Sequence, residues 1–129
     1  MVEIFKNSKI TDTQLNGLFE VSWSNHTNRC FGPVLEQSLA YFSGFDNEQL
    51  VAYLNLAWDG GRHGFLLDTT VHPSYRRQGI ALELIGQAKN AASNNGLEWL
   101  HVDFESKYEQ LYLKAGFSCS SAGVLRLTG

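Results

Sequence analysis

The sequence predicts a single α/β or α+β domain built around one mixed sheet. Some segments carry apolar residues in short, nearly continuous runs typical of strands, and others repeat them at helical spacing. The two kinds of segment are interspersed along the chain, in the order β-α-α-β-β-α-β-α-β-β. The length, residues 1–129, suits one domain that can bury a sizeable core.

The first third is predicted to hold a strand and two helices. Residues 2–5 form the strand. Thr11 and Gln14 have the spacing of a capping box, which starts the first helix. The second helix begins near Pro33, because proline suits the first helical position, and Gly44 ends it. Its apolar face is predicted to consist of Leu35, Leu39 and Phe42.

The middle of the chain predicts a β-hairpin followed by a helix. Residues 50–58 and 64–71 are strand-like, and the Asp-Gly-Gly turn between them indicates antiparallel pairing. Both runs are apolar on both faces at several positions, so we expect central strands covered on each side. Residues 80–95 form the helix, which Gly96 terminates.

The last third is predicted to contain a strand, a helix and two closing strands. The strand covers residues 97–104. Ser106 and Glu109 form a second capping box, opening a helix that Gly116 closes. The closing strands are residues 117–120 and 122–127.

Charge and cysteine content exclude several classes of protein. Lys and Arg number 10 against 13 Asp and Glu, a formal net charge of -3, so a nucleic-acid partner is not expected. The first twelve residues lack an apolar signal segment and no run is long enough to span a membrane. A cytoplasmic protein with no membrane partner is therefore expected. Cys30 and Cys119 lack metal-ligand spacing and are predicted to be buried, reduced thiols, with a disulfide between the two as the alternative.

Residues 66–81, LLDTTVHPSYRRQGIA, carry the clearest chemical signal. A strand runs through a proline-broken turn into a helix that starts at Gly79, where main-chain N–H groups are unpaired and the helix dipole is positive. Gly79 allows close approach to the main chain, and Arg76 and Arg77 add phosphate donors. This pattern indicates a phosphate or pyrophosphate cradle. The alternative is a plain helix start with solvated arginines; P-loop and GxGxxG motifs are absent.

The stretch VHPSYRRQGIA at residues 71–81 closely resembles the acetyl-CoA signature of the GNAT N-acetyltransferases, [Q/R]-x-x-G-x-[G/A] after a V-x-P turn. The stretch LYLKAGF at residues 111–117 resembles the second signature of the same family. The resemblance spans nearly the whole chain. It implies a mostly antiparallel sheet that splays apart between two strands and is flanked by about four helices.

The resemblance also implies that acetyl-CoA is the cosubstrate. Its pyrophosphate would bind the main chain of residues 77–81, and its pantetheine arm would pair with residues 69–71. That pairing requires the strands ending at Val71 and Phe104 to separate and leave N–H and C=O groups free. The implied cofactor-binding residues are Thr69, Thr70, Val71, Arg76, Arg77, Gln78, Gly79, Ile80 and Ala81.

The implied reaction is direct acetyl transfer, in a ternary complex, to a primary amine of a small molecule or a protein. Tyr112 lies where the family places the general acid for the leaving thiolate, and a phenol with a pKa near ~10 stays protonated at neutral pH. A main-chain N–H near Val71 would stabilise the oxyanion. The base that deprotonates the amine is left open among Asp68, Asp103, His72, Glu105 and a water.

Other polar residues have two interpretations. His101, Asp103 and Glu105 share one face of a predicted strand, which we interpret as a polar face rather than a metal site. His26 and His63 are predicted to be surface loop residues, and Cys119 a core residue rather than a nucleophile. The three residues that either wall an acceptor pocket or fill core and loop are Trp23, His26 and Phe31.

The sequence leaves three alternative functions open. A non-catalytic CoA-binding module would bind CoA without turnover, an interaction domain would bind no CoA, and a nucleotide-binding protein would bind ATP as well. The acidic balance favours a cationic amine acceptor by steering. A monomer or a homodimer is expected.

Overall fold

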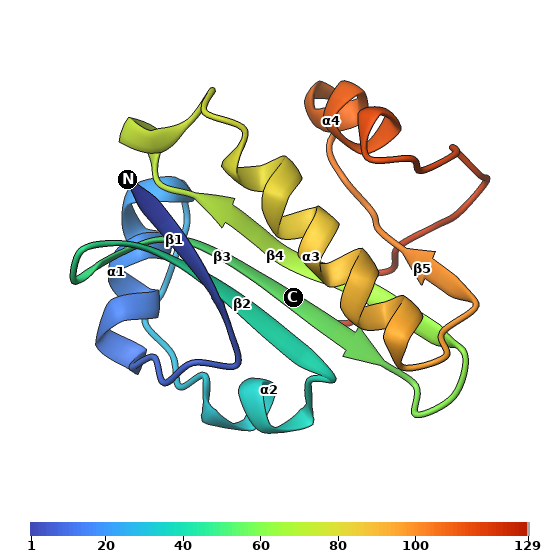
Figure 1. Cartoon of the computed structure of the whole chain (residues 1–129), viewed down its shortest axis with the longest axis horizontal. Coiled ribbons are helices and arrows are strands. Elements are labelled where there is room, and N and C mark those ends of the chain that lie inside the picture. The colour runs from blue at the N-terminus through green and yellow to red at the C-terminus, as the bar shows by residue number, and fades with distance from the viewer. Residues whose placement is uncertain (129) are drawn as a thin grey trace.

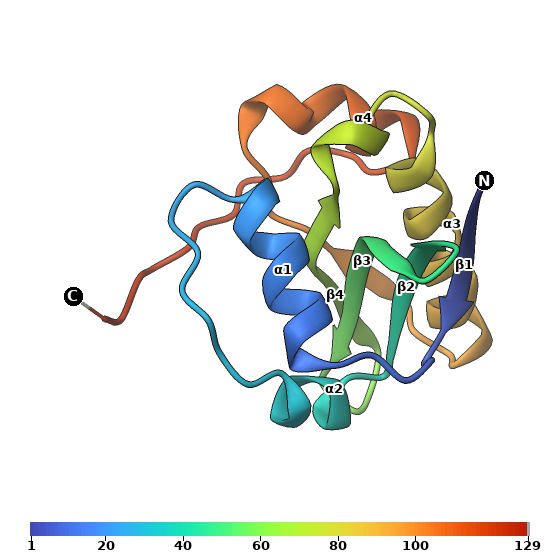
Figure 2. The same cartoon turned by 90° about the vertical axis from the view of Figure 1, so that its left-hand side faces the viewer.

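The computed structural model describes residues 1–128 as a five-stranded sheet with helices on both faces (Figures 1 and 2). The elements are β1 (Val2–Lys6), α1 (Asp12–Ser22), α2 (Gly32–Gln37), β2 (Ala40–Asp46), β3 (Gln49–Trp58), β4 (His63–Val71), α3 (Ile80–Asn94), β5 (Trp99–His101) and α4 (Glu109–Lys114), with 3-10 turns at Pro73–Tyr75 and Ser106–Tyr108. The strands lie in chain order; β4 and β5 are parallel and the other neighbours antiparallel. The predicted fold class is thus confirmed. The predicted domain end, Gly129, lies outside the described residues.

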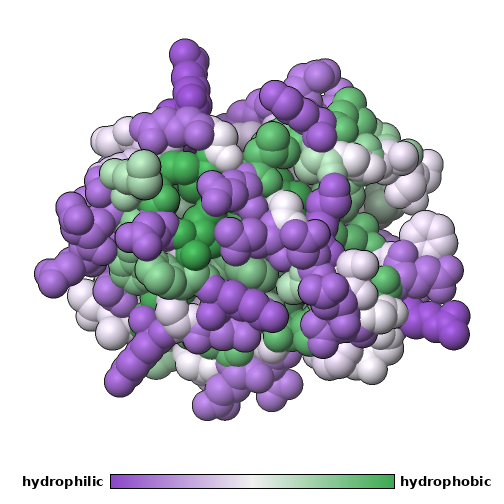
Figure 3. Space-filling view, in the orientation of Figure 1, coloured by the Kyte–Doolittle hydropathy of each residue, from purple (hydrophilic) through white to green (hydrophobic). Residues whose placement is uncertain are grey.

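Each face of the sheet has its own core. On one face α3 and α4 bury Leu84 and Tyr112 against Leu54, and on the other α1 packs Phe19 against Tyr53. β3 lies between these cores and is buried along most of its length, which explains its continuous apolar run. On the face that carries α3, hydrophobic side chains at the surface are interspersed with hydrophilic ones (Figure 3).

The helix ends agree with their sequence signals at α1 and α3. The Thr11 hydroxyl oxygen accepts a hydrogen bond from the Gln14 N–H at 3.1 Å, and the Gln14 side chain accepts one from the Thr11 N–H at 2.8 Å. Gly96 follows α3 with a φ of 76°, as a left-handed helix end requires. The second predicted capping box is wrong. Ser106 opens a 3-10 turn instead, and no side chain caps α4.

The predicted second helix is also too long. α2 ends at Gln37, and Ser38 adopts an extended conformation. Phe42 and Gly44 lie in β2, where Phe42 pairs with Leu54 of β3. A central strand such as β3 needs a partner on each side, and this pairing outweighs the short helical repeat of apolar residues.

The C-terminal third departs most from expectation. β5 has three residues rather than eight, and residues 115–128 contain no strand, so both predicted closing strands are wrong. Cys119 lies in this exposed segment, and Cys30 is exposed too; both are free thiols rather than buried ones.

His63 begins β4 instead of lying in a loop. Within residues 1–128, no helix has the length and hydrophobicity to cross a bilayer.

Candidate active site

The two parallel strands β4 and β5 separate after a short pairing. Their ladder runs from His63↔Trp99 to Phe65↔His101. β4 then continues to Val71, whereas residues 102–105 leave the sheet. The predicted splay is therefore present, and the second half of β4 faces an opening with main-chain groups that β5 does not pair.

A β-bulge in β4 lies beside this opening. Tyr53 pairs with Thr70 but Asn55 pairs with Leu67, so β4 contains one extra residue. Asp68 sits in the bulge with a φ of 57°, a left-handed conformation that Asp tolerates better than most residues. The bulge places the side chain of Asp68 at the opening.

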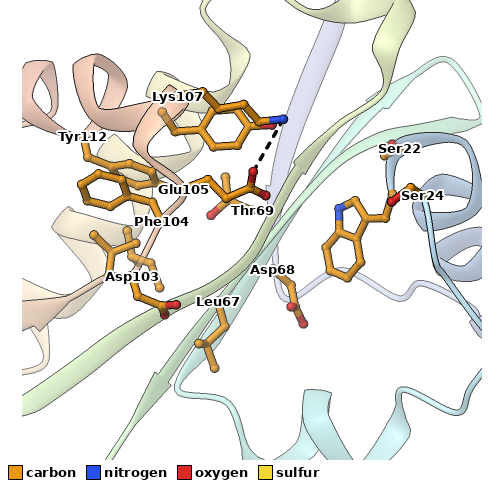
Figure 4. Close-up of a pocket in the computed structure, with 14 residues that line it drawn as sticks. Ser22, Ser24, Leu67, Asp68, Thr69, Asp103, Phe104, Glu105, Lys107 and Tyr112 are labelled. Atoms are coloured by element: carbon orange, nitrogen blue, oxygen red, sulfur yellow. Dashed lines mark ion pairs between the residues drawn. The ribbon is translucent and has the colours of Figure 1, made fainter. Parts of the chain in front are cut away.

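The opening is a pocket of about 700 Å³, here named the splay pocket (Figure 4). It is enclosed by β4, the segment after β5, the start of α4 and the end of α1. Its lining residues are Ser22, Trp23, Ser24, Leu66, Leu67, Asp68, Thr69, Val102, Asp103, Phe104, Glu105, Lys107, Tyr108 and Tyr112. Figure 4 shows Asp68, Asp103 and Glu105 arranged around the same space, which gives the pocket an acidic lining.

The carboxylates of the splay pocket differ in their surroundings. Burial raises the pKa of Asp68, and the guanidinium of Arg29, 3.7 Å from its Oδ2, acts in the opposite direction. Glu105 forms an exposed ion pair with Lys107 at 3.7 Å. Asp68 therefore takes up a proton more readily than an ordinary aspartate, which suits it to proton transfer.

A second pocket, of about 390 Å³, lies between the end of β4, the start of α3 and α4, and is named the α3 pocket. All the predicted cofactor-binding residues except Gln78 line it, namely Thr69, Thr70, Val71, Arg76, Arg77, Gly79, Ile80 and Ala81. Lys114 of α4 adds a further cation to the two arginines. The pocket thus combines main-chain groups with positive charge, as a phosphate site requires.

The loop before α3 has the backbone conformation of an anion site. Arg77 and Gly79 have φ angles of 65° and 78°. No side chain caps α3 at Gly79, so its first N–H groups are open to a ligand. A Cβ on Gly79 would meet no atom within 4 Å, so there is room for a side chain. Glycine is favoured at this position because of its left-handed backbone conformation. Arg76 Nε donates to the Val71 carbonyl at 3.1 Å and ties the loop to β4.

The two pockets meet at Tyr112. The residues common to both linings are Ser22, Trp23, Thr69, Tyr108 and Tyr112. The ring of Tyr112 stacks on Phe104 at 4.7 Å and contacts Phe117 edge-on at 5.8 Å, so its position is fixed. Burial raises the pKa of Tyr112, so the phenol stays protonated to a higher pH than an ordinary tyrosine.

Two other base candidates are less suited to the role. His72 lines neither pocket, and its Nδ1 accepts a hydrogen bond from the Ser74 N–H at 3.0 Å. Glu105 lines the splay pocket but is paired with Lys107. The expected common face of His101, Asp103 and Glu105 does not form, because β5 ends at His101.

Of the three candidate wall residues near α1, one lines the pockets. Trp23 borders both, whereas Phe31 is buried in the core. His26 is half-buried in its loop and bonds Asn16 at 2.9 Å. Sequence reasoning missed Arg29, since nothing in the sequence links its loop to Asp68.

A family model described as the acetyltransferase (GNAT) family matches residues 10–117, and the chain belongs to this family. A search of curated protein sequences found no significant match. A Staphylococcus aureus protein described as a probable acetyltransferase has a similar structure, with a TM-score of 0.86 and 18% identity, covering 100% of both chains.

Two other solved structures similar to this chain carry more specific descriptions. The aminoglycoside N-acetyltransferase AAC(6')-Iy, in complex with a CoA bisubstrate analogue, has a TM-score of 0.77 at 18% identity, over 100% of this chain and 99% of that one. The ribosomal-protein-S18-alanine N-acetyltransferase of Escherichia coli has a TM-score of 0.75 at 16% identity, over 94% and 80%. Identities this low show a shared fold.

Proposed function

We propose that this protein is an acetyl-CoA-dependent N-acetyltransferase that acts on a primary amine of a small molecule or a protein. The observation that carries the proposal is the meeting of two different pockets at Thr69 and Tyr112, beside the unpaired half of β4. Direct transfer requires both substrates to be held at one point together. Family membership and the CoA analogue bound by AAC(6')-Iy support acetyl-CoA as the donor.

Acetyl-CoA occupies the α3 pocket. Its pyrophosphate lies against the main-chain N–H groups of residues 77–81, with Arg76, Arg77 and Lys114 as the flanking cations. Its pantetheine arm runs along residues 69–71 and pairs with their N–H and C=O groups, as an added strand would. This path brings the thioester to the junction of the two pockets.

The acceptor amine attacks the thioester carbonyl carbon, so a C–N bond forms and the C–S bond breaks. Main-chain N–H groups near Val71 stabilise the oxyanion. Tyr112, whose raised pKa keeps its proton available, protonates the departing thiolate, and the extra proton on the newly acylated nitrogen then passes to the Tyr112 phenolate. Asp68 removes the proton of the incoming ammonium, because burial favours its protonated form. Asp103, in the same pocket, is the second candidate for this step.

The acceptor binds in the splay pocket. Its three carboxylates favour a cationic amine, and Trp23 supplies an aromatic wall. The described relatives act on an aminoglycoside and on a ribosomal protein, so both acceptor classes are retained. A cytoplasmic location, with no nucleic acid or membrane partner, stays a prediction.

Release of free thiol from acetyl-CoA in the presence of a panel of amines tests the proposal. We expect amine-dependent thiol release, with acetylated amine identified by mass spectrometry. CoA binding without turnover of any small-molecule amine, peptide N-terminus or lysine peptide would instead favour a non-catalytic CoA-binding module.

A further inference from the structure

We propose that Arg29 is a positioning residue for the base, and that its guanidinium holds the Asp68 carboxylate ionised and in place at the wall of the splay pocket. The inference rests on the proposed function, in which Asp68 removes a proton from the acceptor ammonium. Arg29 belongs to residues 23–31, which join α1 to α2 and are here named the α1–α2 loop. A catalytic base is commonly oriented by a third group, and Arg29 is placed to be that group.

The contact between the two side chains leaves Asp68 open to a substrate. Arg29 Nη2 lies 3.7 Å from Asp68 Oδ2. Asp68 lines the splay pocket whereas Arg29 does not, so the guanidinium approaches the carboxylate from outside the pocket (Figure 4 shows Asp68 beside β4). An ammonium inside the pocket can therefore reach the carboxylate while Arg29 stays in contact with it.

The bulge leaves the Asp68 carboxylate dependent on this partner. Asp68 has left-handed backbone, with a φ of 57°, in the irregular part of β4. Within residues 1–128 its carboxylate accepts no hydrogen bond, and Arg29 is its one ion-pair partner. A partly buried carboxylate without hydrogen bonds needs a nearby cation to stay ionised and to keep one orientation.

Both the main chain and the side chain of Arg29 are fixed. Asn16 of α1 accepts a hydrogen bond from the Arg29 N–H at 3.0 Å and donates one to the Arg29 carbonyl oxygen at 2.9 Å. The guanidinium lies 4.8 Å from the ring centre of Phe31 and 5.9 Å from that of Phe19, distances at which an aromatic face attracts a cation. Both rings are buried in the core, so the cation is held against a rigid surface.

Arg29 is the cation that acts most directly on Asp68. Burial raises the pKa of Tyr53, on the neighbouring strand β3, to about 12, so this phenol is neutral at ordinary pH. Lys107 lies 3.7 Å from Glu105, which compensates its charge. Loss of the Arg29 charge should therefore raise the pKa of Asp68, because no cation would then oppose the effect of burial. The other titratable side chains that line the pocket are Asp103, Tyr108 and Tyr112.

The pH dependence of turnover in Arg29→Gln tests the role, with an amine that the natural protein acetylates. The acid limb of kcat and of kcat/KM should move to higher pH. Above this limb kcat should be reduced by about 10-fold, without a rise in the KM of the amine, because the carboxylate has lost its orientation. A residue that only stabilised the α1–α2 loop would lower the Tm and leave the limb in place, and that result would overturn the proposal.

Carbon-13 NMR of the Asp68 carboxyl carbon tests the same contact without turnover. The resonance is assigned by its loss in Asp68→Asn, and its titration midpoint should lie at higher pH in Arg29→Gln. Arg62→Gln is the matched control, since Arg62 also forms an exposed ion pair, 3.4 Å from Glu98, and lines neither pocket. An unchanged midpoint in Arg29→Gln would overturn the proposal even if amines are acetylated. A raised midpoint without acetylation of any amine would count against the proposed function alone.

Asn16→Ala tests whether α1 positions Arg29. This variant loses both hydrogen bonds to the Arg29 main chain, so the Asp68 midpoint should rise, by less than in Arg29→Gln. In the Arg29→Gln background Asn16→Ala should cause no further rise, because residues that act through one another are not additive. Equal rises in the two backgrounds would overturn this route through Arg29.

Discussion

The two pockets are built from different parts of the polypeptide. The α3 pocket draws its proposed phosphate-binding N–H groups from one stretch of backbone, namely the end of β4, the left-handed turn at Arg77 and Gly79, and the start of α3. The splay pocket presents side chains that come from distant segments, with Trp23 after α1, Asp68 in the bulge and Asp103 after β5. A binding site formed by backbone depends on a few conformations, so substitution of a single glycine should abolish binding. In a site formed by side chains, each substitution should remove only part of the activity.

The largest effect is expected at Gly79. In Gly79→Glu a side chain and a negative charge enter the proposed pyrophosphate site, so acetyl-CoA binding measured by calorimetry should be lost. No atom lies within 4 Å of a Cβ at this position, and the left-handed backbone costs about 1–2 kcal/mol, so the variant should still fold.

Gly96 offers a matched control at the other end of α3. Its φ is 76°, and a Cβ there also meets nothing within 4 Å. Gly96→Glu therefore carries the same charge and similar backbone strain, yet it should bind acetyl-CoA normally. Equal affinities of the two variants for acetyl-CoA would show that the pyrophosphate does not bind in the α3 pocket.

Tyr112→Phe should leave binding intact and reduce turnover. The ring keeps its contacts with Phe104 and Phe117, but the proton for the thiolate is gone. Loss of a general acid typically lowers kcat by about 10²–10⁴-fold. Tyr108→Phe, at a second tyrosine that lines both pockets, is the control and should retain near-normal kcat. An undiminished kcat in Tyr112→Phe would exclude the acid role.

Asp68→Asn should have a smaller effect, about 100-fold on kcat/KM, because a water can carry part of the proton transfer. The low-pH limb of the pH profile, set by the raised pKa of Asp68, should disappear. Asp103→Asn should keep this limb and raise KM for cationic amines. If the low-pH limb instead disappeared in Asp103→Asn and persisted in Asp68→Asn, Asp103 would be the base.

The smallest effect is on stability. Because burial raises the folded-state pKa of Asp68 above its value in the unfolded chain, ionisation favours unfolding as pH rises. The side chain introduced in Asp68→Asn cannot ionise, and Asn adopts the left-handed backbone conformation readily. The free energy of unfolding of this variant at neutral pH should therefore exceed that of the natural protein, by at most about 1 kcal/mol, and its Tm should be correspondingly higher. The gain should shrink at about pH 4 and below; a gain independent of pH would rule out this cause.

The same contrast decides what the sequence could predict. The α3 pocket was predictable because one contiguous stretch, residues 66–81, encodes its strand, turn and helix start. The splay pocket was predictable only in part: Asp68 and Asp103 were candidates, but the ion pair of Asp68 with Arg29 depends on a loop placed by tertiary structure. Non-local pairing likewise decided the strands, since the helical apolar repeat of Leu35, Leu39 and Phe42 runs on into β2, and β2 nevertheless pairs with β1 and β3.

Thermal unfolding with acetyl-CoA, CoA and ATP at matched concentrations tests most directly whether the α3 pocket holds CoA. A ligand at about 100 times its Kd adds roughly 2.7 kcal/mol, which raises the Tm of a domain this size by about 10 °C. We expect this rise with both CoA species, no comparable rise with ATP, and none in Gly79→Glu. Unchanged Tm with acetyl-CoA and CoA would contradict the cofactor assignment and the enzymatic function built on it.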